Sequence, residues 1–167
     1  MSVVINGYSD DLVNLFKNEK KRLATILPNN TTIEHVGSSA VGIGGKNIVD
    51  ILVGTKNADE MLKVRDILVQ NGYYEGHDSH DDRIFLASKE GETSEGDFHI
   101  HICPISENSY QDFIILRDYL RNNPLKAQEY FDKKYEFAKL AGFDRKQYKS
   151  LKSKYVSDLI AEAKNRP

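Results

Sequence analysis

The chain has 167 residues, enough for one domain with a hydrophobic core. Hydrophobic residues make up 40% of the chain and charged residues 29%, which excludes an intrinsically disordered protein. The formal net charge of −2 argues against a general nucleic-acid-binding surface, so we expect no nucleic-acid partner. No apolar run is long enough for a membrane span or a signal peptide, and the one cysteine, Cys103, excludes an internal disulfide. We therefore expect a protein of the reducing cytoplasm without a membrane partner.

Charge is distributed unevenly along the chain. Residues 106–167 hold 13 Lys and Arg against 9 Asp and Glu, whereas residues 1–105 hold 10 against 16. The simpler explanation is that the second part presents solvated helix faces. The alternative is that it brings cations to an anionic ligand held by the first part.

Hydrophobic periodicity predicts the elements in order. In the first 105 residues we expect helices over about residues 10–27 and 57–72, and strands over residues 31–36, 48–53, 83–87 and 98–103. A hydrophilic turn over residues 89–97 precedes the last strand. Beyond Pro104 the pattern is helical, with helices over about residues 106–122, 124–141 and 144–164. This order indicates an α+β fold in a single domain, with a mixed sheet and flanking helices over residues 1–105 and a helical tail over residues 106–167.

The most informative stretch covers residues 32–54. Its first strand leads into Gly37 and Ser38, small residues that let the backbone approach a ligand closely. Successive N–H groups in such a turn suit a phosphate, above all where the turn opens a short helix. Asp50 then lies in an apolar strand, where a carboxylate is costly unless it is paired, hydrogen-bonded or bound to a metal. The two features predict a site for a metal-bound phosphate.

Two histidines form the second informative feature. In the strand over residues 98–103, His99 and His101 point to one face because strand side chains alternate. If this strand lies beside Asp50, the imidazoles can reach the same metal ion or phosphate. Otherwise they are polar residues on a solvated sheet face.

The run EHVGSSAVGIGGKNIVDILVG, at residues 34–54, resembles the signature of the GrpB family, a branch with a nucleotidyltransferase-like fold. The resemblance continues through Arg83, the histidine strand and RDYLRNNP at residues 117–124. It ends in the Tyr-xxx-Lys pairs Tyr130 with Lys134 and Tyr148 with Lys152. Since it covers nearly the whole chain in order, the resemblance implies a nucleotidyltransferase-like mixed β-sheet.

The chain departs from an active nucleotidyltransferase at the acidic positions. The resemblance implies that an active enzyme of this superfamily carries Asp-x-Asp on this strand and a third acidic residue on a later strand. Here Leu52 occupies the second position, and the later strand offers His99 and His101. Carboxylates suit Mg²⁺, whereas imidazoles suit Zn²⁺ or Mn²⁺. We therefore expect Asp50, His99 and His101 to be the catalytic and metal-binding group, with His35 as a further ligand and one divalent metal (Mg²⁺, Mn²⁺ or Zn²⁺) in place of a two-metal clamp.

Cationic residues supply candidate contacts to the ligand. We expect Lys46, Arg83, Arg117 and Arg121 to neutralise phosphate charge, with Gly37 and Ser38. Arg117 and Arg121 are four residues apart on a predicted helix and share a face. The alternatives are interhelical ion pairs for these arginines, a solvated loop position for Lys46 and an edge-strand position for Arg83.

Other polar residues are weaker candidates. We expect Glu34 to hold a basic partner in the site such as Lys46 or Arg83, and the alternative is an ion pair at the end of the strand. Lys134, Tyr148 and Lys152 would count as solvated residues without the family resemblance. The polar loop over residues 77–82 has the composition of a metal site, but the resemblance does not include it and we expect no site there.

These features predict a protein that binds a nucleotide or another phosphorylated small molecule, with metal-dependent nucleotidyl transfer as the reaction that the resemblance implies. Leu52 favours the alternative, a noncatalytic binding module that has lost transfer activity. A third hypothesis is metal-dependent hydrolysis on a transferase scaffold, which is consistent with the two histidines on the last strand.

Overall fold

A computed structural model describes residues 3–89 and 97–166. In this part of the chain one mixed sheet has the strand order β1-β2-β5-β4-β3. Its strands are β1 (Thr32–Val36), β2 (Val49–Thr55), β3 (Tyr74–Glu75), β4 (Ile84–Ala87) and β5 (Phe98–Pro104). β2 and β5 are parallel, and the other neighbours are antiparallel. The predicted α+β fold with a mixed sheet is therefore confirmed.

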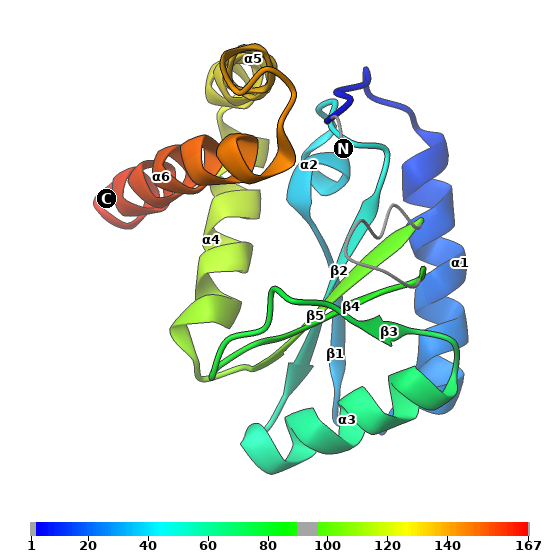
Figure 1. Ribbon diagram of the computed structural model, residues 1–167. Coiled ribbons are helices and arrows are strands. Elements are labelled where there is room, and N and C mark those ends of the chain that lie inside the picture. The colour runs from blue at the N-terminus through cyan, green and yellow to red at the C-terminus, as the bar shows by residue number, and fades with distance from the viewer. Residues whose placement is uncertain (1–2, 90–96, 167) are drawn as a thin grey trace.

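Helices lie on both sides of the sheet (Figure 1). They are α1 (Asp11–Ile26), α2 (Gly37–Val41), α3 (Ala58–Gln70), α4 (Asn108–Asn122), α5 (Pro124–Leu140) and α6 (Arg145–Lys164). α1 and α3 pack on one face of the sheet and enclose the main hydrophobic core. On the other side, the short helix α2 continues β1, and α4 lies over the sheet with α5 and α6 packed against it.

Side-chain alternation in β2 determines what each face carries. Ile51 and Val53 point into the core beneath α1 and α3. Asp50 and Leu52 point to the opposite face, where Leu52 packs with α4 residues such as Tyr110. Because the side-chain period is two, a register shift of one residue would exchange these sets. The α4 side is therefore the face on which a polar site can form.

The helix boundaries follow local signals in the sequence. The Asn57 side chain accepts a hydrogen bond from the Glu60 N–H and caps α3, and Asp144 caps α6 through the Gln147 N–H. For α1 the cap is Ser9, whose Oγ accepts from the Asp11 N–H, rather than Asp10.

The hydrophilic turn over residues 89–97 lies mostly outside the described residues. Within residues 3–89 and 97–166, no helix is both long and apolar enough to cross a membrane.

Candidate functional site

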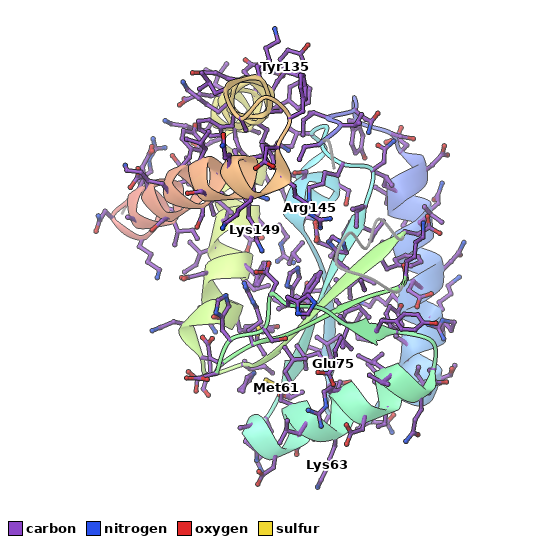
Figure 2. All side chains as sticks on the ribbon, in the orientation of Figure 1. Met61, Lys63, Glu75, Tyr135, Arg145 and Lys149 are labelled. Carbon is purple, nitrogen blue, oxygen red and sulfur yellow. The ribbon has the colours of Figure 1, made fainter. Side chains whose placement is uncertain are left out.

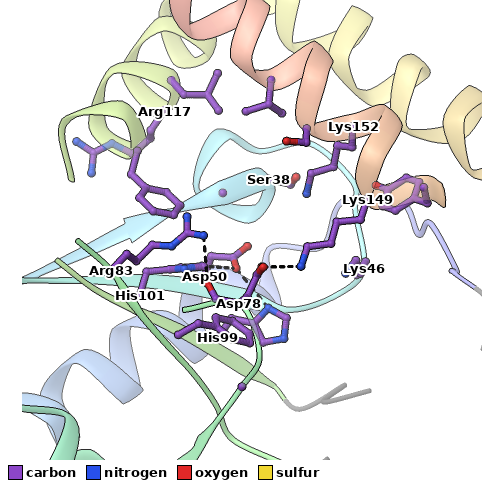
Figure 3. A pocket seen from close by; sticks show the side chains of 18 of the residues that line it. Ser38, Lys46, Asp50, Asp78, Arg83, His99, His101, Arg117, Lys149 and Lys152 are labelled. Carbon is purple, nitrogen blue, oxygen red and sulfur yellow. Dashed lines mark hydrogen bonds and ion pairs between the residues drawn. The ribbon is translucent and has the colours of Figure 1, made fainter. Parts of the chain in front are cut away.

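Asp50 and the two histidines meet on the α4 side of the sheet, as Figure 3 shows. In the parallel pairing of β2 and β5, Asp50 is opposite His99 and Leu52 is opposite His101. Asp50 Oδ1 lies 3.6 Å from His99 Nδ1 and 3.5 Å from His101 Nε2. Both imidazoles are buried, while the Asp50 side chain is 29% exposed toward the pocket described below. The structure thus brings Asp50 to two histidines that lie about fifty positions further along the sequence.

The protonation of this group follows from its surroundings. Burial alone would raise the pKa of Asp50, but the neighbouring imidazoles of His101 and His99 outweigh it and hold that pKa well below its usual range. Burial lowers the pKa of His101, against the opposing effect of Asp50. The site therefore holds an ionised carboxylate beside a neutral His101 at neutral pH. The two imidazoles beside the carboxylate are the compensation that an acid in an apolar strand requires.

Gly37 places the backbone against this carboxylate. Its φ of +73° lies in the left-handed region, which side chains other than glycine rarely adopt. A Cβ at this position would also collide with Asp50 Oδ2. Both the conformation and the close approach require glycine where β1 passes into α2.

His35 lies on the opposite face of the sheet, contrary to its expected role as a ligand. It is paired with Ile51 in the antiparallel register and so shares the α1 face. Its Nε2 is 2.9 Å from Ser39 Oγ, and its ring stacks on Phe16 with centroids 4.3 Å apart. Burial lowers its pKa to about 4. His35 therefore acts in packing between α1 and the sheet, apart from Asp50.

A pocket of about 480 Å³ opens above Asp50, between the sheet and helices α4, α5 and α6. Its volume is in the range of small-molecule sites. Among the described residues that line it are six Lys and Arg side chains and two acids: Lys46, Arg83, Arg117, Arg145, Lys149, Lys152, Asp50 and Asp78. The pocket is therefore strongly cationic although the chain as a whole carries a net charge of −2.

Four of these cations, Lys46, Arg83, Arg145 and Lys152, have no carboxylate within ion-pair distance in the described part of the chain. Arg83 Nε and Arg145 Nη1 are buried without a hydrogen-bond partner there. Burial, followed by the charges of Lys152 and Arg145, lowers the pKa of Lys46 to about 8. Buried donors and mutually repelling cations are costly unless an anion binds between them.

The two arginines predicted on α4 have different roles. Arg117 lines the pocket, but its Nη1 donates to Glu34 Oε2 at 2.7 Å and its Nε to Asp118 at 2.8 Å. Glu34 thus pairs with Arg117, and the expected pairing with Lys46 or Arg83 is wrong. Arg121 donates from Nε to the Ala40 carbonyl and does not line the pocket. Both arginines therefore tie α4 to the end of β1 and to α2.

Lys134 is more central than the sequence indicated. Its side chain is only 2% exposed, and its Nζ donates to Ser38 Oγ at 2.6 Å and to the Gly44 carbonyl. Gly44 is next to Gly45, which pairs with Asn6 through two backbone hydrogen bonds. Lys134 therefore connects α5 to the Gly-Ser turn and to the glycine-rich connector.

Sequence reasoning also missed that Arg145, Lys149 and the polar loop contribute to the pocket. Arg145 and Lys149 project from the beginning of α6 toward the sheet (Figure 2), and Lys149 Nζ is 2.5 Å from Asp78 Oδ1. From this loop His77, Asp78 and His80 line the pocket, although we had expected no site there. The spacing of Arg145, Lys149 and Lys152, at i, i+4 and i+7, was the available signal, since it places all three on one helix face.

The residues present do not fit the metal site that we expected. Leu52 is fully buried and supplies no second carboxylate. The imidazole nitrogens of His99 and His101 face the same oxygen of Asp50. Within residues 3–89 and 97–166, no group of three or more His, Cys, Asp and Glu is placed to hold a metal ion. Cys103, on β5, is fully buried, and burial raises the pKa of its thiol to about 12.

The sheet, the glycine at the end of β1 and the acid on β2 define a nucleotidyltransferase-like α+β protein. In agreement, the fold is similar to that of Cid1 solved in complex with its short product ApU, with a TM-score of 0.50 and 16% identity, covering 77% of this chain and 41% of that one. The chain belongs to the GrpB family, since the family model described as "GrpB protein" matches residues 2–162.

Relatives of known sequence and structure agree with this assignment. The crystal structure of the conserved protein GrpB from Enterococcus faecalis is similar, with a TM-score of 0.80 and 25% identity, covering 96% of each chain. The glutamate-rich protein GrpB of Alkalihalophilus pseudofirmus is 29% identical over 96% of this chain and 95% of its own length. A UPF0157 protein of Pseudomonas aeruginosa is 30% identical over 87% of this chain and 60% of its own length.

Proposed function

We propose that the protein binds a nucleotide or another phosphorylated small molecule in the pocket between the sheet and α4–α6. The observation that carries this proposal is the set of cations without carboxylate partners among the described residues: Lys46, Arg83, Arg145 and Lys152. Guanidinium and ammonium groups converging on one cavity are the usual receptors for phosphate oxygens.

The lining of the pocket indicates how such a ligand would lie. The phosphate groups would bind between the cationic side chains of Lys46, Arg145 and Lys152 and the Gly-Ser turn. The backbone N–H groups of Gly37 and Ser38 would be further donors. The remaining wall is apolar and would cover the uncharged part of the ligand. It includes Val41, Leu116, Leu120 and Val156.

Nucleotidyl transfer is the reaction that the fold suggests. Cid1 is named as a poly(U) polymerase, and by analogy this chain would catalyse in-line attack on an α-phosphate. Leu52 favours the noncatalytic alternative, because it replaces a carboxylate with a fully buried apolar side chain. Since the donor set around Asp50 does not fit a metal site, we derive no step through a metal ion.

Diphosphate binding by calorimetry tests the proposed pocket, with matched variants on α6. Lys152→Gln removes a cation that lines the pocket, and Lys154→Gln is the control, since Lys154 is 84% exposed and pairs with Asp158. We expect Lys152→Gln to weaken binding by about tenfold, equivalent to about 1.4 kcal/mol, and Lys154→Gln to leave it nearly unchanged. Equal affinity in all three proteins, or no binding to any, would contradict the proposal.

A panel of nucleotides then separates binding from turnover. Each ligand is added with and without Mg²⁺, Mn²⁺ or Zn²⁺, and both the melting temperature and diphosphate release are measured. A ligand at a hundred times its Kd should stabilise the protein by about 2.7 kcal/mol. Stabilisation without product supports the binding module, whereas diphosphate release supports the transferase.

A further inference from the structure

Ser38 and Lys134 form a hydrogen-bonded pair that ligand binding by itself does not explain. As an ammonium, Lys134 donates from Nζ to Ser38 Oγ, 2.6 Å away, and to the Gly44 carbonyl. As a neutral amine, Nζ would keep the bond to Gly44 and accept from the Ser38 hydroxyl. Ser38 lines the pocket and is partly exposed to it, whereas Lys134 lies behind it and is 2% exposed. A serine hydroxyl at the wall of a cavity, held against a buried amine, has the layout of a nucleophile with an adjacent base.

The surroundings of Lys134 favour the neutral amine. In the described part of the chain no carboxylate lies within ion-pair distance of Nζ. The charged groups that act on it are Lys152 from α6 and Asp50 from β2. Burial and then Lys152 lower the pKa of Lys134 to about 7, while Asp50 opposes them. A large share of Lys134 is therefore able to accept a proton near neutral pH.

The other nucleophilic side chains nearby are less well placed. Ser39 is 3% exposed and hydrogen-bonds to His35, so its hydroxyl is directed away from the pocket. Cys103 is fully buried, and its raised pKa keeps it a thiol. Ser38 is thus the hydroxyl that combines access to the pocket with a basic partner.

We propose that Ser38 is a nucleophile, that Lys134 is its general base, and that the electrophile is the phosphorus atom of a phosphoric anhydride or ester bound in the pocket. The Ser38 Oγ–P bond forms while the P–O bond to the leaving group breaks. The leaving oxygen departs with the electron pair, as diphosphate if the substrate is a nucleoside triphosphate, and the hydroxyl proton passes to Lys134 Nζ. The substrate class rests on the proposed function, whereas the reactivity of the pair does not.

A fluorophosphonate probe tests the pair without requiring the natural substrate. The probe phosphonylates an activated serine and releases fluoride, and peptide mass spectrometry identifies the modified residue. With the full chain we expect labelling of Ser38 at a rate that rises with pH around a midpoint near 7, the pKa of Lys134. Ser38→Ala should abolish this labelling, and Lys134→Met should slow it by about a hundredfold.

The matched controls are Lys133→Met and Ser150→Ala. Both residues are outside the pocket lining; Lys133 pairs with Glu136, and Ser150 is exposed on α6. We expect both controls to be labelled at the rate of the unaltered chain.

Three outcomes would overturn the proposal: an unmodified Ser38, equal rates in Lys134→Met and the unaltered chain, or a rate without a midpoint near pH 7. If Lys134→Met does not fold, the pH profile of the unaltered chain decides. Diphosphate binding without labelling would overturn the nucleophile but leave the proposed function standing. Labelling without diphosphate binding would overturn the phosphate substrate class.

Discussion

Several residues of the site contact a partner from another part of the chain. Asp50 is held in its charged form by His99 and His101, and Gly37 places the backbone beside its carboxylate. Lys134 donates to Ser38 Oγ. A change at one of these positions should therefore affect its partner as well as the side chain removed.

Gly37→Ala tests this coupling at a single residue. The new Cβ would be forced against Asp50 Oδ2 in a left-handed backbone conformation, so we expect a loss of about 2–4 kcal/mol in the free energy of unfolding. Gly42→Ala is the matched control, since Gly42 also has a positive φ, of +87°, but no atom lies within 4 Å of its added Cβ. It should cost only about 1 kcal/mol of backbone strain. Urea denaturation gives both values, and equal losses would show that contact with Asp50 is unimportant.

At the scale of elements, α6 and the polar loop enclose the pocket from two sides. Lys149 of α6 pairs with Asp78 of the loop between β3 and β4, although the residues are 71 positions apart. Burial raises the pKa of Asp78, but the hydrogen bond from Lys149 outweighs this and lowers it. Both side chains are partly exposed, so the pair contributes only about 0–1 kcal/mol to stability. Its larger effect is on the charge available to a ligand.

Asp78→Asn should therefore strengthen anion binding with little change in stability. The substitution removes a carboxylate from the pocket and frees Lys149 to contact a phosphate group. We expect diphosphate to bind about three- to tenfold more tightly, with a gain that shrinks at high salt. Asp81→Asn is the control, because Asp81 is exposed in the same loop and does not line the pocket. Unchanged or weaker binding by Asp78→Asn would place the ligand away from Lys149.

At the scale of the whole molecule, both parts of the chain contribute charged side chains to one cavity. Residues 1–105 supply two acids and two cations, whereas the helical tail supplies cations, among them Arg145, Lys149 and Lys152. The charge excess of residues 106–167 thus includes the pocket wall as well as solvated helix faces. Without an anion, the half-buried Lys46 and the buried Lys134 remain next to other cations, and this should be visible in the pH dependence of stability.

The free energy of unfolding should rise between pH 7 and 8.5 in phosphate-free buffer. Lys134 and Lys46 have folded-state pKa values of about 7 and 8, below the ordinary value of 10.5. In this window the unfolded chain binds more protons than the folded protein, so stability increases with pH, by up to about 1.4 kcal/mol per pH unit for each group. Urea denaturation at several pH values measures the slope.

Near pH 9 the slope should become shallower because Cys103 acts in the opposite direction. Its thiol stays protonated in the folded protein, so the free energy of unfolding decreases with pH once the thiol of the unfolded chain ionises. In Lys134→Met the slope should become shallower, whereas in Lys133→Met it should stay unchanged. A flat or falling profile in the unaltered chain would show that the buried lysines keep their ordinary pKa values.

The sequence by itself determined the local structure and the chemical character of the pocket. Alternation placed His99 and His101 on one face, capping residues located the starts of helices such as α3 and α6, and glycine and serine identified the turn. These features depend on near neighbours in the chain, so one sequence is enough to predict them.

Only the tertiary structure decided which of these residues meet. The parallel pairing of β2 with β5 brings the histidines to Asp50, while the antiparallel register of β1 sends His35 to the other face. The packing of α4, α5 and α6 assigns Arg117 to Glu34 and Lys134 to Ser38, and leaves the cations of α6 facing the pocket. Such contacts join residues tens of positions apart, and their partners are selected by register and helix packing, which local sequence patterns do not specify.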